Sequence, residues 1–122
     1  MRITLILAAI YNISGGLTII FFFWLVAPLL NFNDSGPGLF RMFVGGTALL
    51  FGAAYIAVLR NYPENRQLLV FGTVLKYWAF AISLFAFLTS GLSVQVLFVF
   101  GIGNLIFAGL FTHYLLRPQI GR

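Results

Sequence analysis

The stretch LLVFGTVLKYWAFAISLF, residues 68–85, decides the fold, because it is apolar enough to lie in lipid and yet has Lys76 near its middle. A transmembrane helix needs about 20 predominantly apolar residues, and this stretch has the composition of the centre of such a span. A lysine in hydrocarbon is costly and usually faces other helices or a functional group. The stretch therefore predicts a membrane helix in which Lys76 needs a partner.

The composition of the whole chain agrees with a membrane location. Hydrophobic residues make up 61% of the 122 residues and charged residues only 7%, against about 25% charged in an ordinary soluble domain. The mean hydropathy is +1.05. We expect residues 1–122 to form a single integral membrane domain.

The placement of the charges, the absence of cysteine and the single histidine disfavour several functional classes. The net charge is +5, but the charges fall between apolar runs and form no basic stripe with interleaved aromatics, so no nucleic-acid partner is predicted. Cysteine is absent, which excludes disulfides and cysteine-ligated metals. With His113 as the single histidine, no metal site and no cofactor is predicted.

Four apolar runs are separated by loops with turn composition. NFNDSGPG (31–38) is rich in turn residues, RNYPENR (60–66) is polar with Pro63 holding Tyr62 out of a helix, and TSG (89–91) is a tight break. We expect an all-α, four-helix transmembrane bundle in which short loops make consecutive helices antiparallel, up-down neighbours. The predicted spans are residues 3–30, 39–59, 67–88 and 92–115.

The arginines predict an orientation. Four spans put both termini on one side, which then carries five arginines against only Arg41 on the other. The five are Arg2, Arg60, Arg66, Arg117 and Arg122. Under the positive-inside rule both termini are expected in the cytoplasm, with the protein in the inner membrane of a bacterium.

Polar residues of different spans fall at a similar depth. Counted from the same end of each span at 1.5 Å per residue, Asn12 and Lys76 lie about 13 Å in and Asn104 about 17 Å in. Thr47 lies about 18 Å in by the same count. These depths are near the middle of a hydrocarbon core of about 30 Å, so we expect a polar level at mid-membrane.

Each predicted span also has a face of small and polar residues at spacings of three or four. Such faces let helix backbones approach and hydrogen-bond across the contact. The faces are Ala8, Asn12 and Gly15; Gly45, Ala48, Gly52 and Tyr55; Gly72, Lys76, Ala79 and Ser83; and Gly101, Asn104 and Ala108. The candidate ligand-binding residues are Lys76, Asn104, Asn12, Thr47 and Tyr55, and no residue is predicted to be catalytic.

The partner of Lys76 stays open at this point. The only carboxylates, Asp34 and Glu64, lie in loops. Lys76 can be neutral, reach a neighbouring amide or carbonyl, extend to the interface, or meet a negative group from elsewhere. Its stem reaches about 6 Å, which is short of the roughly 13 Å to the interface, so the inward alternative is favoured.

The stretch GAAYIAVLRNYPENRQLLVFGTVLKYWAF (52–80), followed by GIGNLIFAGLFTHYL (101–115), resembles small four-span bacterial membrane proteins, broadly the DoxX-like families. The shared features are Gly52 and Tyr55 late in the second span, the loop with Pro63, and the G-x-x-x-K of Gly72 and Lys76. The resemblance covers about residues 40–115 and implies a four-helix membrane bundle without an established activity. Such relatives often have an acid where this chain has Asn104, so an ion pair with Lys76 lacks its acid here.

Three functions fit these residues. The favoured one is a non-enzymatic binding or assembly module, which packs against another membrane subunit or holds a quinone, lipid or similar apolar molecule near Lys76. The alternatives are an oligomeric small-solute transporter or channel, whose path usually has more than one ionisable group, and a membrane enzyme, which would lack the usual acid–base groups. The expected partners are the lipid bilayer and a larger membrane complex or a homo-oligomer.

Overall fold

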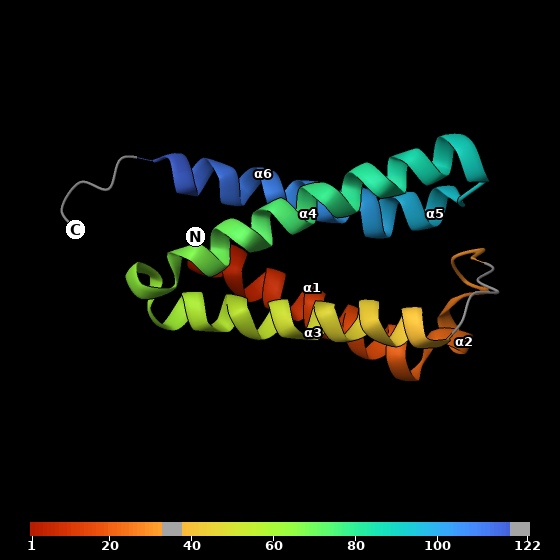
Figure 1. The fold of residues 1–122 in the computed structure, drawn as a ribbon, viewed down its shortest axis with the longest axis horizontal. Helices are drawn as coiled ribbons and strands as arrows, with labels where there is room; N and C mark the ends of the chain where they lie inside the picture. Colours follow the sequence, from red (N-terminus) through yellow and green to blue (C-terminus); the bar gives the residue numbers. More distant parts are fainter. Residues whose placement is uncertain (33–37, 118–122) are drawn as a thin grey trace.

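The computed structural model describes residues 1–32 and 38–117, and their fold is an all-α bundle of four long apolar helices (Figure 1). Each of the four is long and apolar enough to cross a membrane, which marks the chain as an integral membrane protein. In chain order the elements are α1 (Arg2–Phe21), α2 (Phe23–Val26), α3 (Gly38–Arg60), α4 (Tyr62–Ser90), α5 (Val94–Val96), the π-helix η1 (Leu97–Ile102) and α6 (Gly103–Leu116).

The first span is shorter than the predicted 3–30. Helix α1 ends at Phe21, Phe22 has non-helical backbone angles, and the short α2 follows. Twenty residues of α1 already extend about 30 Å, which is enough to cross the hydrocarbon. Pro28 lies inside the predicted span and has no backbone N–H to continue a helix, and Asn31 then takes a left-handed conformation with φ of 51°.

The predicted loop at 60–66 is wrong, because only Asn61 separates α3 from α4. Pro63 lies in the first turn of α4, where its missing N–H costs nothing, so Tyr62 is helical. Asn65 departs from helical angles, and its side-chain Nδ2 donates to the carbonyls of Ala57 (3.1 Å) and Asn61 (2.9 Å). The side chain thus ties the end of α3 to the start of α4.

A break is present between α4 and the fourth span, but it lies at residues 91–93 rather than at the predicted 89–91, because α4 continues through Ser90. Gly91 caps α4 with a φ of 74°, a conformation that favours glycine. The fourth span begins at Val94 rather than at residue 92, and Ser93 caps it by accepting a hydrogen bond from the Val96 N–H at 3.2 Å.

The bundle is built from two helix pairs. Helix α1 packs closely along α3, α4 packs along η1 and α6, and the two pairs meet mainly through α3 and α4, whereas α1 and α6 touch little (Figure 1). Helix α1 begins and α6 ends at the same end of the bundle, here called the terminal end; the opposite end is the far end.

Glycines set the distance between α1 and α3. An added Cβ on Gly16 would lie 2.7 Å from the Gly45 carbonyl oxygen, and one on Gly45 would lie 3.1 Å from the Gly16 carbonyl oxygen. The predicted small-residue face on α1 is therefore wrong in one member. Gly15 has open space around it, and Gly16, four residues after Asn12, makes the contact instead.

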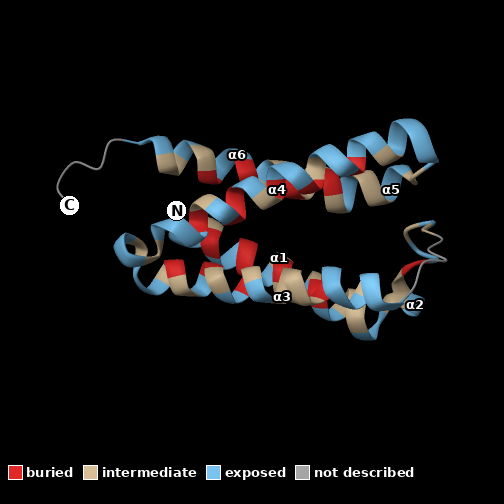
Figure 2. Ribbon diagram, in the orientation of Figure 1, coloured by how far each residue is buried: buried red, intermediate tan, exposed pale blue. Residues whose placement is uncertain are grey.

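The remaining small-residue faces point inward as predicted. Gly72, Lys76, Ala79 and Ser83 of α4 are buried, and so are Gly101, Asn104 and Ala108 (Figure 2). On α3 the face is buried at Gly45, Gly52 and Tyr55 and half-buried at Ala48. The periodicity therefore identified the inward side of these helices correctly.

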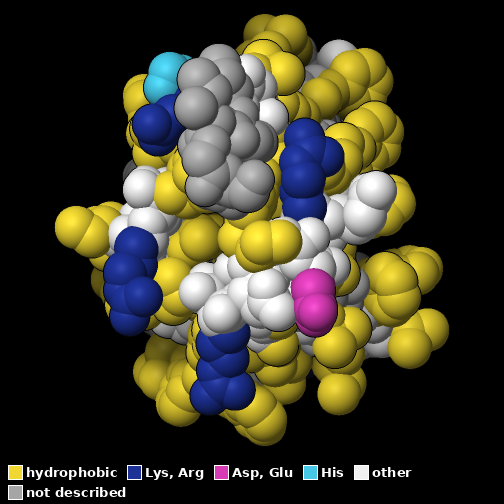
Figure 3. Space-filling view, turned by 90° about the vertical axis from the view of Figure 1, so that its left-hand side faces the viewer, with side chains coloured by type: hydrophobic (Ala, Val, Ile, Leu, Met, Phe, Trp, Pro, Cys, Tyr) yellow, Lys and Arg dark blue, Asp and Glu magenta, His cyan; other side chains and the backbone are white. Residues whose placement is uncertain are grey.

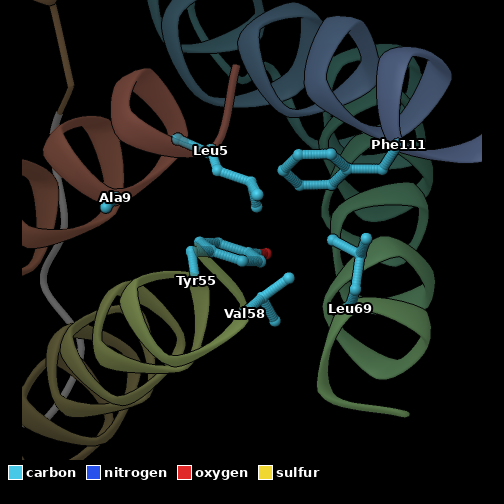
Figure 4. Packing of buried hydrophobic residues seen from close by; sticks show 7 residues of the cluster. Leu5, Ala9, Tyr55, Val58, Leu69 and Phe111 are labelled. Carbon is cyan, nitrogen blue, oxygen red and sulfur yellow. The ribbon is translucent and has the colours of Figure 1, made fainter. Parts of the chain in front are cut away.

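The apolar core lies toward the terminal end. Its largest fully buried side chains come from three helices: Tyr55 and Val58 from α3, Leu69 from α4 and Phe111 from α6 (Figure 4). The surface at this end carries the basic residues Arg2, Arg60, Arg66 and Arg117 around one acidic residue, Glu64 (Figure 3). Of the arginines in the described ranges, only Arg41 lies at the far end.

Candidate functional site

The ammonium group of Lys76 lies inside the bundle and is held by two side-chain amides. The residue is only 2% exposed. Its Nζ donates to Oδ1 of Asn12 on α1 at 2.8 Å and to Oδ1 of Asn104 on α6 at 2.8 Å. The structure thus brings together three of the predicted site residues from three helices, and Lys76 joins the two helix pairs.

Backbone contacts fix the direction of both amides. The Asn12 Nδ2 donates to the Ala48 carbonyl of α3 at 3.3 Å, and the Asn104 Nδ2 donates to the Phe100 carbonyl at 2.7 Å. Because an ammonium has only donors, the amide atom facing it must be the oxygen. Each asparagine therefore uses its NH₂ group on the backbone and turns its oxygen toward Lys76.

Three aromatic rings complete the surroundings of the amine. Nζ lies 5.0 Å from the ring centroid of Tyr11, 5.2 Å from that of Phe107 and 5.4 Å from that of Tyr55. Ring faces attract a cation when it is removed from water, by about 2 kcal/mol or more. The combination of two amide oxygens and three rings is therefore suited to a charged lysine without a carboxylate.

Tyr11 and Phe107 were missed by reasoning from the sequence. Tyr11 directly precedes Asn12, and Phe107 is one helical turn beyond Asn104, so each lies beside an asparagine of the polar level. Their rings contact each other with centroids 5.4 Å apart. An aromatic residue within one turn of each polar residue is the signal that could have found them.

The π-helix η1 directly precedes Asn104. At its end the Gly103 N–H donates to the carbonyls of both Phe98 and Phe100. The Tyr11 hydroxyl donates to the Val99 carbonyl inside η1, which ties α1 to this element. Widened turns of this kind occur often at functional sites. Nothing in the apolar sequence LFVFGI distinguishes such a turn from an ordinary α-helix.

Tyr55, another predicted site residue, is fully buried beside Lys76, and its hydroxyl has no hydrogen-bond partner in the described ranges 1–32 and 38–117. The hydroxyl lies against Gly72, where an added Cβ would be 2.7 Å from it. Buried polar groups without a partner are rare and call for an explanation.

Thr47 does not join this group. Its hydroxyl donates to the Phe43 carbonyl one turn earlier on α3, at 2.8 Å, and the residue is half-buried. A threonine hydroxyl that donates to its own helix in this way needs no hydrogen-bond acceptor from a neighbouring helix. The site therefore consists of Lys76, Asn12, Asn104, Tyr11, Tyr55 and Phe107, called the lysine centre below.

Comparison with known proteins adds no relative: no family model, no curated protein and no solved structure matches this chain.

Proposed function

We propose that this chain is a non-catalytic membrane binding module, which holds an apolar molecule with an accepting oxygen atom at the lysine centre. A quinone carbonyl or a lipid ester carbonyl has the required chemistry. The observation that carries the proposal is a pair of neighbouring buried groups, Lys76 and Tyr55, whose donors are not all used. Lys76 uses two of its three N–H groups on the asparagines, and the Tyr55 hydroxyl makes no bond to any described residue.

Unused donors in such a place are costly. A buried donor without an acceptor costs about 1–3 kcal/mol, because it has lost water and gained nothing. A guest oxygen that accepts from these donors would remove that cost, and the rings of Tyr11, Tyr55 and Phe107 would contact the flat apolar part of the guest. This combination of rings with a few placed polar groups is usual in small-molecule sites.

The least-packed side of the bundle gives the guest a route from lipid. Helices α1 and α6 touch little, and the half-buried rings of Tyr11 and Phe107 fill the space between them at the level of Lys76. A side-chain rotation there would open the lysine centre sideways without separating α1 from α3.

The geometry favours binding over conduction. The terminal half of the bundle is closed by the fully buried side chains of Tyr55, Leu69 and Phe111. A solute moving along the bundle axis would have to displace this core.

The resemblance to DoxX-like families is compatible with a bundle of this kind and stays a prediction.

Tyr55→Phe is expected to separate binding from stability. Removing a hydroxyl that has no partner should leave the protein equally stable or more stable, while removing one donor to the guest should weaken binding about fivefold, as for a bond of about 1 kcal/mol. Binding of decylubiquinone and of dioctanoyl phosphatidylcholine to purified protein would be measured by native mass spectrometry, and stability by thermal melting.

Tyr77→Phe is the matched control. The Tyr77 hydroxyl is partnered, at 2.8 Å from the Thr112 hydroxyl, and lies outside the lysine centre. This variant should lose a little stability and bind both probes like the native chain. Binding of neither probe to the native protein, or equal binding by the Tyr55→Phe variant, would contradict the proposed function.

A further inference from the structure

Arg41 is held in a fixed position near the start of α3, at the far end of the bundle. Its guanidinium carbon lies 5.3 Å from the centroid of the Phe23 ring and 5.5 Å from that of the Trp24 ring. An added Cβ on Gly38 would be 3.8 Å from its Nη2, so the guanidinium lies beside the first residue of α3. Two rings and a helix end thus orient this one cation.

No described residue neutralises this charge. Arg41 Nε is buried and has no hydrogen-bond partner within residues 1–32 and 38–117. The one described carboxylate, Glu64, lies in the first turn of α4 at the terminal end. A buried donor on a charged group has a high cost when it stays unpaired, which indicates a partner from outside these residues.

We infer that Arg41 binds the phosphate of a phospholipid headgroup in the leaflet at the far end. Its planar guanidinium matches the oxygens of a phosphate with two parallel hydrogen bonds, and stacking on aromatic rings pre-orients it. The arginine is three residues from the start of α3, hence about 5 Å from the helix end, which is headgroup level for a spanning helix.

The surroundings of Arg41 fit a lipid as the source of the phosphate. The guanidinium lies over the Trp24 ring, which is 69% exposed, and Leu39 and Phe40, the two residues before Arg41, are 74% and 65% exposed. Tryptophan is enriched at headgroup level. A free phosphate would gain nothing from these apolar neighbours, whereas a lipid would contact them with its chains.

Space for the rest of a headgroup lies beyond the Phe23 and Trp24 rings that hold Arg41. The Phe32 ring packs edge-on against Phe23, with centroids 5.8 Å apart. Phe32 also lines a hollow of about 200 Å³ between the segment after α2 and the turn that joins α4 to α5. The polar groups in its wall are those of Asn31, Ser90 and Ser93.

The test uses the full chain in mild detergent, titrated with dioctanoyl phosphatidylglycerol and observed by native mass spectrometry. Arg41→Gln should weaken the tightest lipid-binding step about fivefold, the equivalent of about 1 kcal/mol for one basic residue at a membrane surface. Arg41→Lys should also weaken it, since a lysine keeps the charge and loses the stacked two-bond geometry.

Two further variants and one competitor make the result decisive. Arg60→Gln, at the other end of α3, should bind the lipid like the native chain, and equal losses in both variants would overturn the inference. Inorganic phosphate should not displace the lipid, and displacement at millimolar concentration would overturn the lipid as the source.

Asp34→Asn tests a partner within the chain and should leave lipid binding unchanged. If Asp34→Asn lowers stability, and Arg41→Gln does not change lipid binding, then the partner of Arg41 is Asp34 and the inference is wrong. The proposed function at the lysine centre is independent of all these outcomes.

Discussion

Lys76→Met is expected to lower the free energy of unfolding by about 3 kcal/mol, although it replaces a costly buried charge with an apolar side chain of similar length. The reason is that Asn12 and Asn104 stay behind with their Oδ1 atoms turned inward and no donor to meet them. Each buried acceptor without a partner costs about 1–3 kcal/mol. The measurement is denaturant or thermal unfolding in a constant detergent.

The triple variant Asn12→Leu, Lys76→Met, Asn104→Leu is its control. It removes donor and acceptors together, and replacing a complete buried polar group with apolar residues is often neutral or stabilising. It should recover most of the lost stability and still fail to bind decylubiquinone. A Lys76→Met variant as stable as the native chain would show that the lysine is not held by these amides.

Gly16→Leu is expected to destabilise the bundle by about 3 kcal/mol, at the upper end of what overpacking costs. The first carbon of the new side chain would lie 2.7 Å from the Gly45 carbonyl oxygen and 2.9 Å from Leu49. A backbone atom cannot rotate away as a side chain can, so α1 and α3 must separate. Loss of folded protein in a detergent melt reports this separation.

The neighbouring glycine provides the comparison for this prediction. An added Cβ on Gly15 meets nothing within 4 Å, and leucine is a better helix former than glycine by up to about 1 kcal/mol. Gly15→Leu should therefore be neutral or stabilising. Equal melting temperatures for the two leucine variants would remove the close contact between α1 and α3 from this account.

The four helices were predictable because apolar length alone determines a membrane span. The element ends were less so. The position of Pro63 in a polar stretch predicts a helix break, but a proline in the first turn of a helix breaks nothing. The first predicted span includes Pro28, although the twenty residues of α1 already suffice to cross the hydrocarbon. With 3.6 residues per turn, the residues three and four positions after Asn12 both lie near its face, so the sequence does not distinguish Gly15 from Gly16.

The lysine centre was predictable in its polar members and not in their arrangement. The distance of each residue from the end of its span predicts one common depth for Asn12, Lys76 and Asn104. It predicts the same depth for Thr47, which donates to its own helix instead. The rings of Tyr11 and Phe107 stand out from the other aromatic residues only by their place within one helical turn of Asn12 and Asn104. From the sequence, a purely structural Lys76 predicts a neutral or stabilising effect of Lys76→Met, and the two amide oxygens reverse that expectation.

The most direct test of the lysine centre uses the fact that the chain contains a single lysine. Solid-state NMR of the protein in bilayers, with ¹⁵N on the lysine Nζ and ¹³C on the asparagine Cγ atoms, observes the partners of Lys76 without assignment of other signals. We predict one Nζ signal with contacts to two asparagine Cγ atoms, one lost in Asn12→Leu and the other in Asn104→Leu. An Nζ signal that contacts lipid phosphorus and no asparagine would show that Lys76 extends to the interface, and it would contradict this account.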